Sequence, residues 1–311
     1  MIDVQNLTKF YNDFCAVDRI SLTIQPGEVL GLLGPNGAGK TTTLRMLTGF
    51  YTPTSGTISV NGLTMPQDTL KIKAMMGYLP ESAPLYHNML VYDYLEYVAR
   101  IKGITSREER QNRLKQLSSL CDLSAIMAKP ISNLSKGLKQ RVGLAHAMMT
   151  DPEILILDEP TSGLDPNQIA EIRDIVRDIG REKTIIFSTH ILSEAEATCD
   201  RIVIINQGKV VADDSTARLK QGDLLRLSLA GAAEADVRTL LTQVDPGLDI
   251  RGVESPEADT LAFEIRHPQG RDLRTPIYQK VKETDWILTQ FARESQGLET
   301  IFQELTTRKE A

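Results

Sequence analysis

Residues 34–41 read GPNGAGKT, which places glycines, a lysine and a threonine at the spacing G-x-x-x-x-G-K-[ST]. In this pattern the glycine-rich backbone curls its amides round phosphate groups at a helix N-terminus. Lys40 would reach the β and γ phosphates, the Thr41 hydroxyl would bind Mg²⁺, and Thr42 could add a hydroxyl to a phosphate oxygen. The predicted nucleotide-binding residues of this loop are Gly34, Pro35, Asn36, Gly37, Ala38, Gly39, Lys40, Thr41 and Thr42.

A second candidate is ILILDEP, residues 154–160, where an apolar run ends in Asp158 and Glu159. Such a run is typical of a central parallel strand, and the carboxyl ends of these strands form the ligand-binding edge of an α/β sheet. Asp158 suits Mg²⁺, usually through water, and Glu159 suits polarising an attacking water as general base. With the phosphate loop, this pair predicts a Mg²⁺-dependent ATP hydrolase.

Composition limits the alternatives. The net charge of −6 argues against a nucleic-acid partner, since phosphate contacts favour a basic surface. The three cysteines, Cys15, Cys121 and Cys199, are widely spaced and fit reduced thiols in a cytosolic protein. No apolar run approaches the roughly 20 residues that span a bilayer, and the start of the chain has no leader pattern. We therefore expect membrane association only through a partner.

The elements that must position these residues follow from periodicity. Strand and helix patterns alternate over the first 210 residues, and residues 90–127 have helical spacing. This predicts an α/β domain built round a parallel sheet.

The composition changes near residues 213–223, which predicts a second domain over residues 221–311. Its patterns read strand, helix, strand, strand, helix, strand, which is a ferredoxin-like α+β order. A final helix is predicted from the apolar spacing of Leu298, Ile301, Phe302 and Leu305.

Five motifs together resemble an ABC transporter ATPase in order and spacing: GPNGAGKTT, LSKGLKQR at 134–141, ILILDEP, SGLD at 162–165 and STH at 188–190. The resemblance covers roughly residues 1–220 and implies a P-loop NTPase of ABC type there, with a helical subdomain at about 82–150. The segments LSKGLKQRVGLAHAM and GLDPNQIAEIR are similar in sequence to the corresponding segments in the ATPases of type-2 ABC exporters, including the gliding-motility branch. The resemblance implies an ATP-hydrolysing subunit that drives separate integral membrane permease subunits from the cytoplasmic face. The branch that it resembles implies an exporter.

The resemblance also implies a head-to-tail dimer with a second copy or a homologous ATPase subunit. Each ATP would lie between the phosphate loop of one subunit and the signature turn of the other, Leu134, Ser135, Lys136 and Gly137. Ser135 would give a hydroxyl and Gly137 an amide to the γ-phosphate, and a helix expected to begin near Leu138 would add its N-terminal dipole. The family commonly reads LSGGQ here, so Lys136 is a departure. It either projects towards the nucleotide or faces solvent.

Four further roles carry over from the family. Tyr11 would stack on adenine, although an ordinary packed tyrosine fits its position too. His190 would contact the γ-phosphate and so act with Glu159 and Lys40 in catalysis, and Asp165 would cross the dimer. Glu81 stands where most of the family has glutamine, and as a carboxylate it would bind Mg²⁺ more strongly.

Two questions stay open from the sequence. Apolar residues Leu85, Tyr86, Met89 and Leu90 would form either a permease-docking surface or ordinary core. An alternative function is a soluble ABC-type ATPase acting on nucleic acid or the ribosome, but such relatives carry two cassettes or a long coiled-coil insertion. Fewer than 100 residues separate the phosphate loop from the signature turn. Residues 224–311 would regulate, dimerise or bind a small effector.

Overall fold

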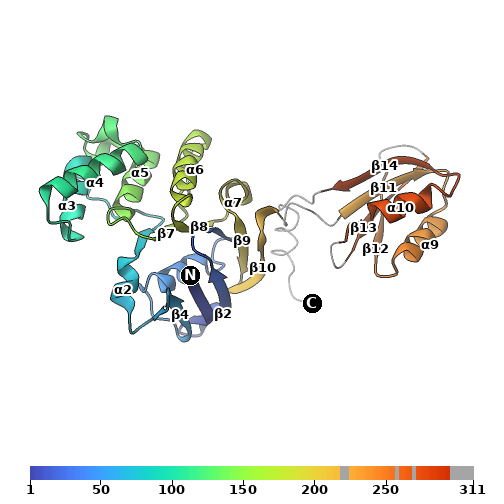
Figure 1. The fold of residues 1–311 in the computed structure, drawn as a ribbon, viewed down its shortest axis with the longest axis horizontal. Coiled ribbons are helices and arrows are strands. Elements are labelled where there is room, and N and C mark those ends of the chain that lie inside the picture. The colour runs from blue at the N-terminus through green and yellow to red at the C-terminus, as the bar shows by residue number, and fades with distance from the viewer. Residues whose placement is uncertain (218–223, 256–258, 268–270, 295–311) are drawn as a thin grey trace. The chain divides into compact units, whose positions relative to one another are not determined.

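A computed structural model describes residues 1–217, 224–255, 259–267 and 271–294. The chain forms two compact units that divide between Thr216 and Ala217, and each is described by itself (Figure 1). The final helix predicted from Leu298 to Leu305 lies outside the described residues.

The first unit is built round a six-stranded sheet in the order β10-β9-β3-β8-β7-β6. Five strands are parallel, and β10 pairs antiparallel with β9. All residues of β3, β7 and β8 are buried, as their continuous apolar sequences require of central strands. The α/β prediction is confirmed. The strands are β3 (Val29–Leu33), β6 (Met76–Leu79), β7 (Ile154–Asp158), β8 (Thr184–Thr189), β9 (Arg201–Asn206) and β10 (Lys209–Ser215).

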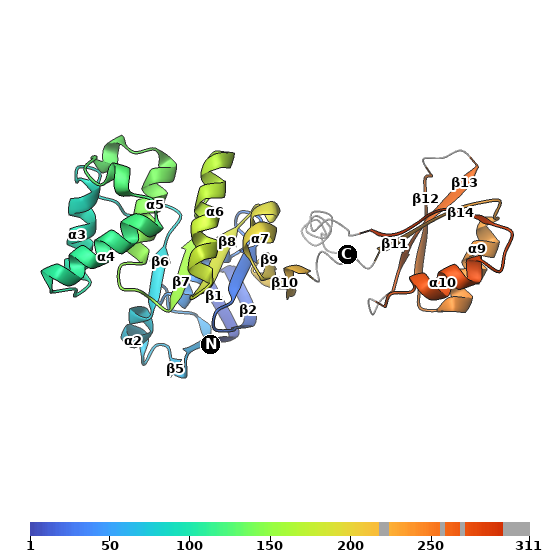
Figure 2. The same cartoon turned by 45° about the horizontal axis from the view of Figure 1, so that its top comes forward.

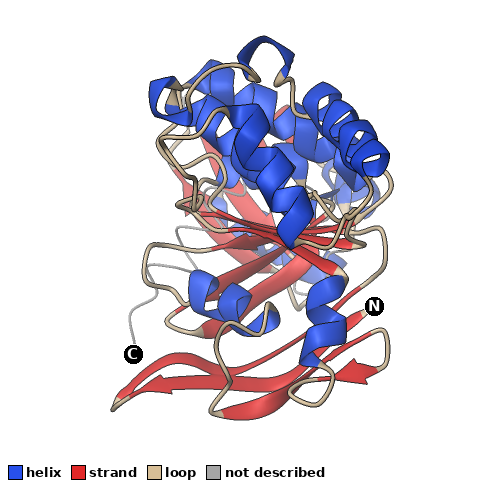
Figure 3. Ribbon diagram, turned by 90° about the vertical axis from the view of Figure 1, so that its left-hand side faces the viewer, coloured by secondary structure: helices blue, strands red, loops and turns tan. Residues whose placement is uncertain are grey.

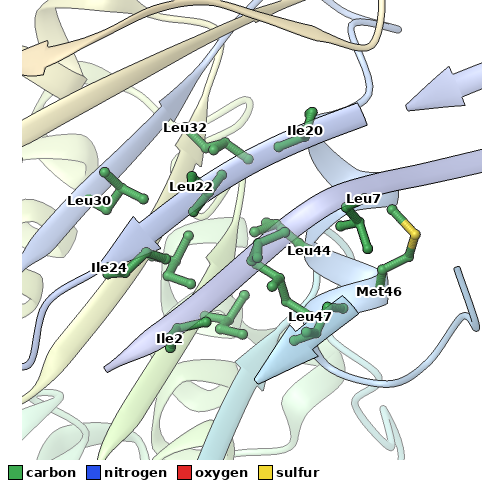
Figure 4. Close-up of a cluster of buried hydrophobic side chains, with 14 of the residues drawn as sticks. Ile2, Leu7, Ile20, Leu22, Ile24, Leu30, Leu32, Leu44, Met46 and Leu47 are labelled. Carbon is green, nitrogen blue, oxygen red and sulfur yellow. The ribbon is translucent and has the colours of Figure 1, made fainter. Parts of the chain in front are cut away.

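A second, antiparallel sheet has the order β2-β1-β4-β5. Its strands are β1 (Ile2–Tyr11), β2 (Phe14–Ile24), β4 (Ser55–Val60) and β5 (Leu63–Thr64). Helix α1 (Lys40–Leu47) packs between the two sheets and contacts β2 and β7, and its Leu44 and Leu47 are fully buried in a core shared with residues of both sheets (Figure 4). Figure 3 shows most helices gathered on one side of the central sheet and the antiparallel strands on the other.

Seven helices belong to the described part of the first unit: α1, α2 (Thr69–Ala74), α3 (Val91–Ile101), α4 (Arg107–Leu120), α5 (Lys136–Ala147), α6 (Pro166–Gly180) and α7 (Leu192–Thr198). The helical pattern predicted for residues 90–127 is divided between α3 and α4, because Gly103 (φ 89°) ends α3 and Ser106 caps α4 anew. Short 3-10 turns cover Ser124–Ile126 and Ile131–Asn133. In the ranges that the structure describes, no helix has the length and apolar character needed to cross a membrane.

The second unit is a four-stranded antiparallel sheet in the order β12-β13-β11-β14. The two helices in its described residues lie on one face of that sheet (Figure 2). They bury a small core that includes Leu227, Phe263 and Ile277. The elements are β11 (Leu224–Ala230), α9 (Glu234–Val244), β12 (Asp249–Val253), β13 (Thr260–Arg266), α10 (Arg274–Val281) and β14 (Ile287–Glu294).

A histidine ties two helices of the first unit together. The Tyr94 hydroxyl on α3 lies 2.6 Å from Nδ1 of His146 on α5, and it donates to the Pro84 carbonyl at 3.1 Å. Burial lowers the pKa of His146 to about 4, with a smaller effect from the charge of Lys102. Below the ordinary histidine pKa of about 6.5 the unfolded chain therefore binds a proton that the folded chain does not.

We expect this difference to make the protein less stable as the pH falls from about 6.5 to about 4. His146→Gln keeps a partner for Tyr94 without a titrating ring, so its melting temperature should fall less over that range. Thermal unfolding followed by circular dichroism at several pH values measures this. His87→Gln, at an exposed position, is the control and should follow the wild type. Equal pH dependence in wild type and His146→Gln would contradict the assignment.

Candidate active site

The phosphate loop lies between β3 and α1 and is packed too tightly for side chains at two of its glycines. A Cβ on Gly34 would overlap the carbonyl oxygen of Ile205, and one on Gly39 (φ 106°) would lie 2.5 Å from that of Ala16. Helix α1 begins at Lys40 without a side-chain cap. Its first amides therefore have no acceptor within the helix and suit an anionic ligand.

Lys40 is held at the head of this loop. Its ammonium donates to the carbonyls of Gly34 at 2.7 Å and Pro35 at 3.2 Å. It also pairs with Glu159 Oε1 at 3.1 Å, and both side chains of the pair are over 90% buried. Phosphate groups entering the loop would thus compete with Glu159 for a lysine that is already in place.

Asp158 ends β7 and is surrounded by hydroxyl groups. Thr41 Oγ1 donates to its Oδ1 at 3.1 Å, Ser188 Oγ to the same oxygen at 2.8 Å, and the Tyr78 hydroxyl to Oδ2 at 3.4 Å. Burial raises the pKa of Asp158, and the Ser188 and Thr41 hydrogen bonds partly oppose that rise. No role for Ser188 or Tyr78 was predicted from the sequence. Ser188 reaches Asp158 because the two residues are paired in register across β7 and β8.

The hydroxyl of Thr41 and the carboxylate of Asp158 are hard oxygen donors of the kind that Mg²⁺ prefers. Within the described ranges there is no group of three or more His, Cys, Asp or Glu residues able to hold a metal. A magnesium ion here would therefore depend on phosphate and water oxygens to complete its shell, which fits the behaviour of Mg²⁺ at nucleotide sites. Glu81 lines the same cavity.

Glu159 adopts a backbone conformation that is unusual for its residue type. Its φ is 49°, in the left-handed region, which costs a non-glycine residue about 1–2 kcal/mol. Its amide donates to Ser188 Oγ at 2.9 Å, and its carboxylate Oε2 lies 2.8 Å from Nδ1 of His190. Ser188 in strand β8 thus holds the backbone of Glu159, and His190, just after this strand, contacts the Glu159 carboxylate.

One cavity of about 470 Å³ collects these groups. It brings Tyr11, Glu81, Glu159 and His190 to the phosphate loop as the sequence predicted, and Asp158 touches it through Thr41. The sequence missed three lining residues: Phe14, Ala16 and Ser162. The full lining is Tyr11, Phe14, Ala16, Asn36, Gly37, Ala38, Gly39, Lys40, Thr41, Thr42, Glu81, Glu159, Ser162 and His190.

Comparison with known proteins decides the family. The family model described as ABC transporter matches residues 17–162. Nod factor export ATP-binding protein I from Burkholderia pseudomallei (strain K96243) is 32% identical over 311 residues, which cover 99% of this chain and 97% of that protein. The chain belongs to the ABC transporter ATP-binding family.

Two other similar proteins extend this finding. Linearmycin resistance ATP-binding protein LnrL from Bacillus subtilis (strain 168) is 34% identical over 240 residues, 76% of this chain and 77% of that protein. A solved dimeric ATP-binding cassette in a post-hydrolysis state, bound to ADP and Pi, aligns with a TM-score of 0.63 at 25% identity, covering 70% of this chain and 99% of that one. The protein is accordingly an ABC-type ATPase.

The signature turn of this ABC ATPase does not line the cavity. Its helix begins at Lys136 and not near Leu138 as predicted, because Ser135 caps it by accepting from the Leu138 amide at 3.3 Å. Gly137 therefore stands in the first turn, where its amide has no acceptor within the helix. A Cβ on Gly137 would lie 2.8 Å from the Gln168 side chain on α6.

Lys136 and Asp165 both lie at the loop that precedes α6. Lys136 is exposed, and its ammonium lies over Gly163, 2.5 Å from where a Cβ would stand. Asp165 caps α6 by accepting from the amides of Asn167 and Gln168, each at 3.0 Å. The turn and this loop thus lie side by side, and only Ser162 of the loop lines the chain's own cavity.

Tyr11 and Phe14 face the same cavity from the turn between β1 and β2, where they are paired in register. Phe14 is 65% exposed. A single exposed aromatic is common at protein surfaces, so no sequence pattern pointed to Phe14. Next to Tyr11, it would offer a second ring for stacking on a nucleobase.

Phe14→Ala should raise the KM for ATP roughly fivefold or more while kcat stays near wild type, because base stacking contributes about 1–3 kcal/mol. Steady-state ATPase assays over a range of ATP concentrations measure the two constants. Phe50→Ala removes an equally exposed phenylalanine outside this cavity and should change neither constant. A fall in kcat at unchanged KM would remove Phe14 from the base site.

Proposed function

We propose that this protein is the ATP-hydrolysing subunit of an ABC exporter, working as a head-to-tail dimer that drives separate permease subunits from the cytoplasmic face of the membrane. The observation that carries the proposal is the meeting of Lys40, Glu159 and His190 beside the phosphate loop in one cavity. Export is supported by the relatives named for Nod factor export and linearmycin resistance.

The geometry supports a specific order of events. Phosphate oxygens that take the Lys40 ammonium release Glu159 Oε1 from its ion pair. The freed Glu159 carboxylate can then accept a proton from the attacking water. His190, whose Nδ1 lies 2.8 Å from Oε2, orients this carboxylate. Mg²⁺, held by Thr41 and Asp158, with Glu81 as a further candidate ligand, would neutralise phosphate charge. Positioning and charge neutralisation are the main requirements of phosphoryl transfer.

The placement of the signature turn supports dimerisation. Ser135 is exposed, Gly137 lies buried in the first turn of α5, and neither lines the cavity of its own chain. We propose that they complete the site of a second subunit, with Lys136 and Asp165 at the same interface. The dimeric cassette among the similar solved structures supports this arrangement.

We propose a permease contact beside the helical subdomain. A groove of about 480 Å³ is lined by aromatic and other side chains, including Phe50, Tyr51 and Pro84. Of the apolar residues considered for docking, Leu85 is buried and belongs to the core, whereas Tyr86 and Leu90 are exposed by 53% and 36%. Met89 is half-buried. Docking on Tyr86 and Leu90 would cover this exposed apolar surface.

For the remainder of the chain, we propose an accessory domain of ferredoxin-like topology over residues 221–311. The order β12-β13-β11-β14 and the alternation of strands and helices support it. Regulation, dimerisation and effector binding are all compatible with such a domain.

The dimer is tested in a Glu159→Gln background, which should bind ATP and hydrolyse it too slowly to reopen. Size-exclusion chromatography with light scattering should show a dimer with ATP. Adding Ser135→Arg should leave a monomer, because the larger cation blocks the turn from the opposite phosphate. Ser119→Arg places the same side chain on an exposed position of α4 and should keep the dimer. An ATP-dependent dimer in the Ser135→Arg protein would overturn the proposal.

A further inference from the structure

A buried carboxylate lies next to the active site and is not part of it. Glu194, on the short helix α7, is only 7% exposed. Its Oε2 accepts two hydrogen bonds, from Thr161 Oγ1 at 2.6 Å and from Thr189 Oγ1 at 2.8 Å. One hydroxyl group comes from the loop after β7 and the other from the last residue of β8, so one oxygen atom joins these two segments.

Each of these two segments is next to one of the groups proposed to act on ATP, Glu159 or His190. Thr161 follows Glu159 by two residues, and Thr189 directly precedes His190. Thr189 Oγ1 also accepts from the Ile191 amide at 3.0 Å, which fixes the backbone on the far side of His190. Glu194 therefore restrains both sides of the contact between Glu159 Oε2 and His190 Nδ1.

The backbone of Glu159 needs such a restraint. A residue held in the left-handed region relaxes unless the surrounding structure over-determines its conformation. Ser188 fixes the Glu159 amide from one side. The Thr161 hydrogen bond to Glu194 fixes the chain two residues later. These two hydrogen bonds fix the backbone at Glu159 and just after it.

Stability alone does not account for a carboxylate at this position. The second oxygen, Oε1, is buried and has no hydrogen-bond partner among the described residues. No lysine, arginine or histidine in the described ranges forms an ion pair with Glu194. A buried acceptor without a donor costs free energy, and an apolar residue would avoid that cost. Such a group is retained more readily at a functional site.

We propose that Glu194 is a positioning residue for ATP hydrolysis, which sets the Glu159–His190 contact through Thr161 and Thr189. The inference rests on the proposed roles of Glu159 and His190. It adds a residue that does not line the nucleotide cavity.

Steady-state ATPase constants of the full-length chain test it. Glu194→Ala should lower kcat about tenfold or more and leave the KM for ATP within about twofold, because the phosphate loop and the aromatic pair remain intact. Glu194→Gln keeps an oxygen that accepts both threonine hydroxyls, so it should recover at least a third of the wild-type kcat. Thr189→Val should lower kcat in the wild type and add little in Glu194→Ala, since residues of one network are not additive.

Glu196→Ala, two residues further along α7, is the matched control and should behave as wild type. Wild-type kcat in Glu194→Ala would overturn the inference. So would an equal loss in Glu194→Gln, or a loss that follows a lower melting temperature, since either marks a merely structural role. An inactive wild-type protein would instead count against the proposed ATPase site itself.

Discussion

The parallel pairing of β3, β7 and β8 is the constraint on which the active site depends. Because these strands run the same way, their carboxyl ends meet at one edge, with Leu33 opposite Thr189 and Asp158 opposite Ser188. The phosphate loop, the two carboxylates and His190 leave the sheet at that edge. A shift in register of one residue would separate Ser188 from Asp158 and turn alternate side chains to the other face.

Burial gives this edge its chemical character. The ion pair between Lys40 and Glu159 lies almost entirely out of water, where charges interact more strongly than at a surface. Such a pair contributes little to stability because both ions lose their hydration. The strained φ of Glu159 is a second local cost. Hydrogen bonds with Ser188 in β8 and with His190 just after it hold Glu159 in place despite these costs, and Glu194 in turn holds Thr189 at the end of β8.

Local patterns in the sequence predicted the parts of the site that are contiguous in the chain. The phosphate loop and the Asp158–Glu159 pair depend on short motifs whose chemistry is fixed by residue type and spacing. Ser188, Phe14 and Glu194 could not be found in this way, because their roles depend on which strands become neighbours. The start of α5 was misplaced by two residues because it depends on a side-chain cap.

The central claim is that Glu159 serves as the base for ATP hydrolysis at this edge. Single-turnover release of phosphate from pre-bound ATP isolates that step. We predict that Glu159→Gln slows release about a hundredfold or more while its affinity for ATP stays within about threefold of wild type. Glu153→Gln, at an exposed position just before the same strand, should release phosphate normally. Release by Glu159→Gln at the wild-type rate would show that Glu159 is not the base.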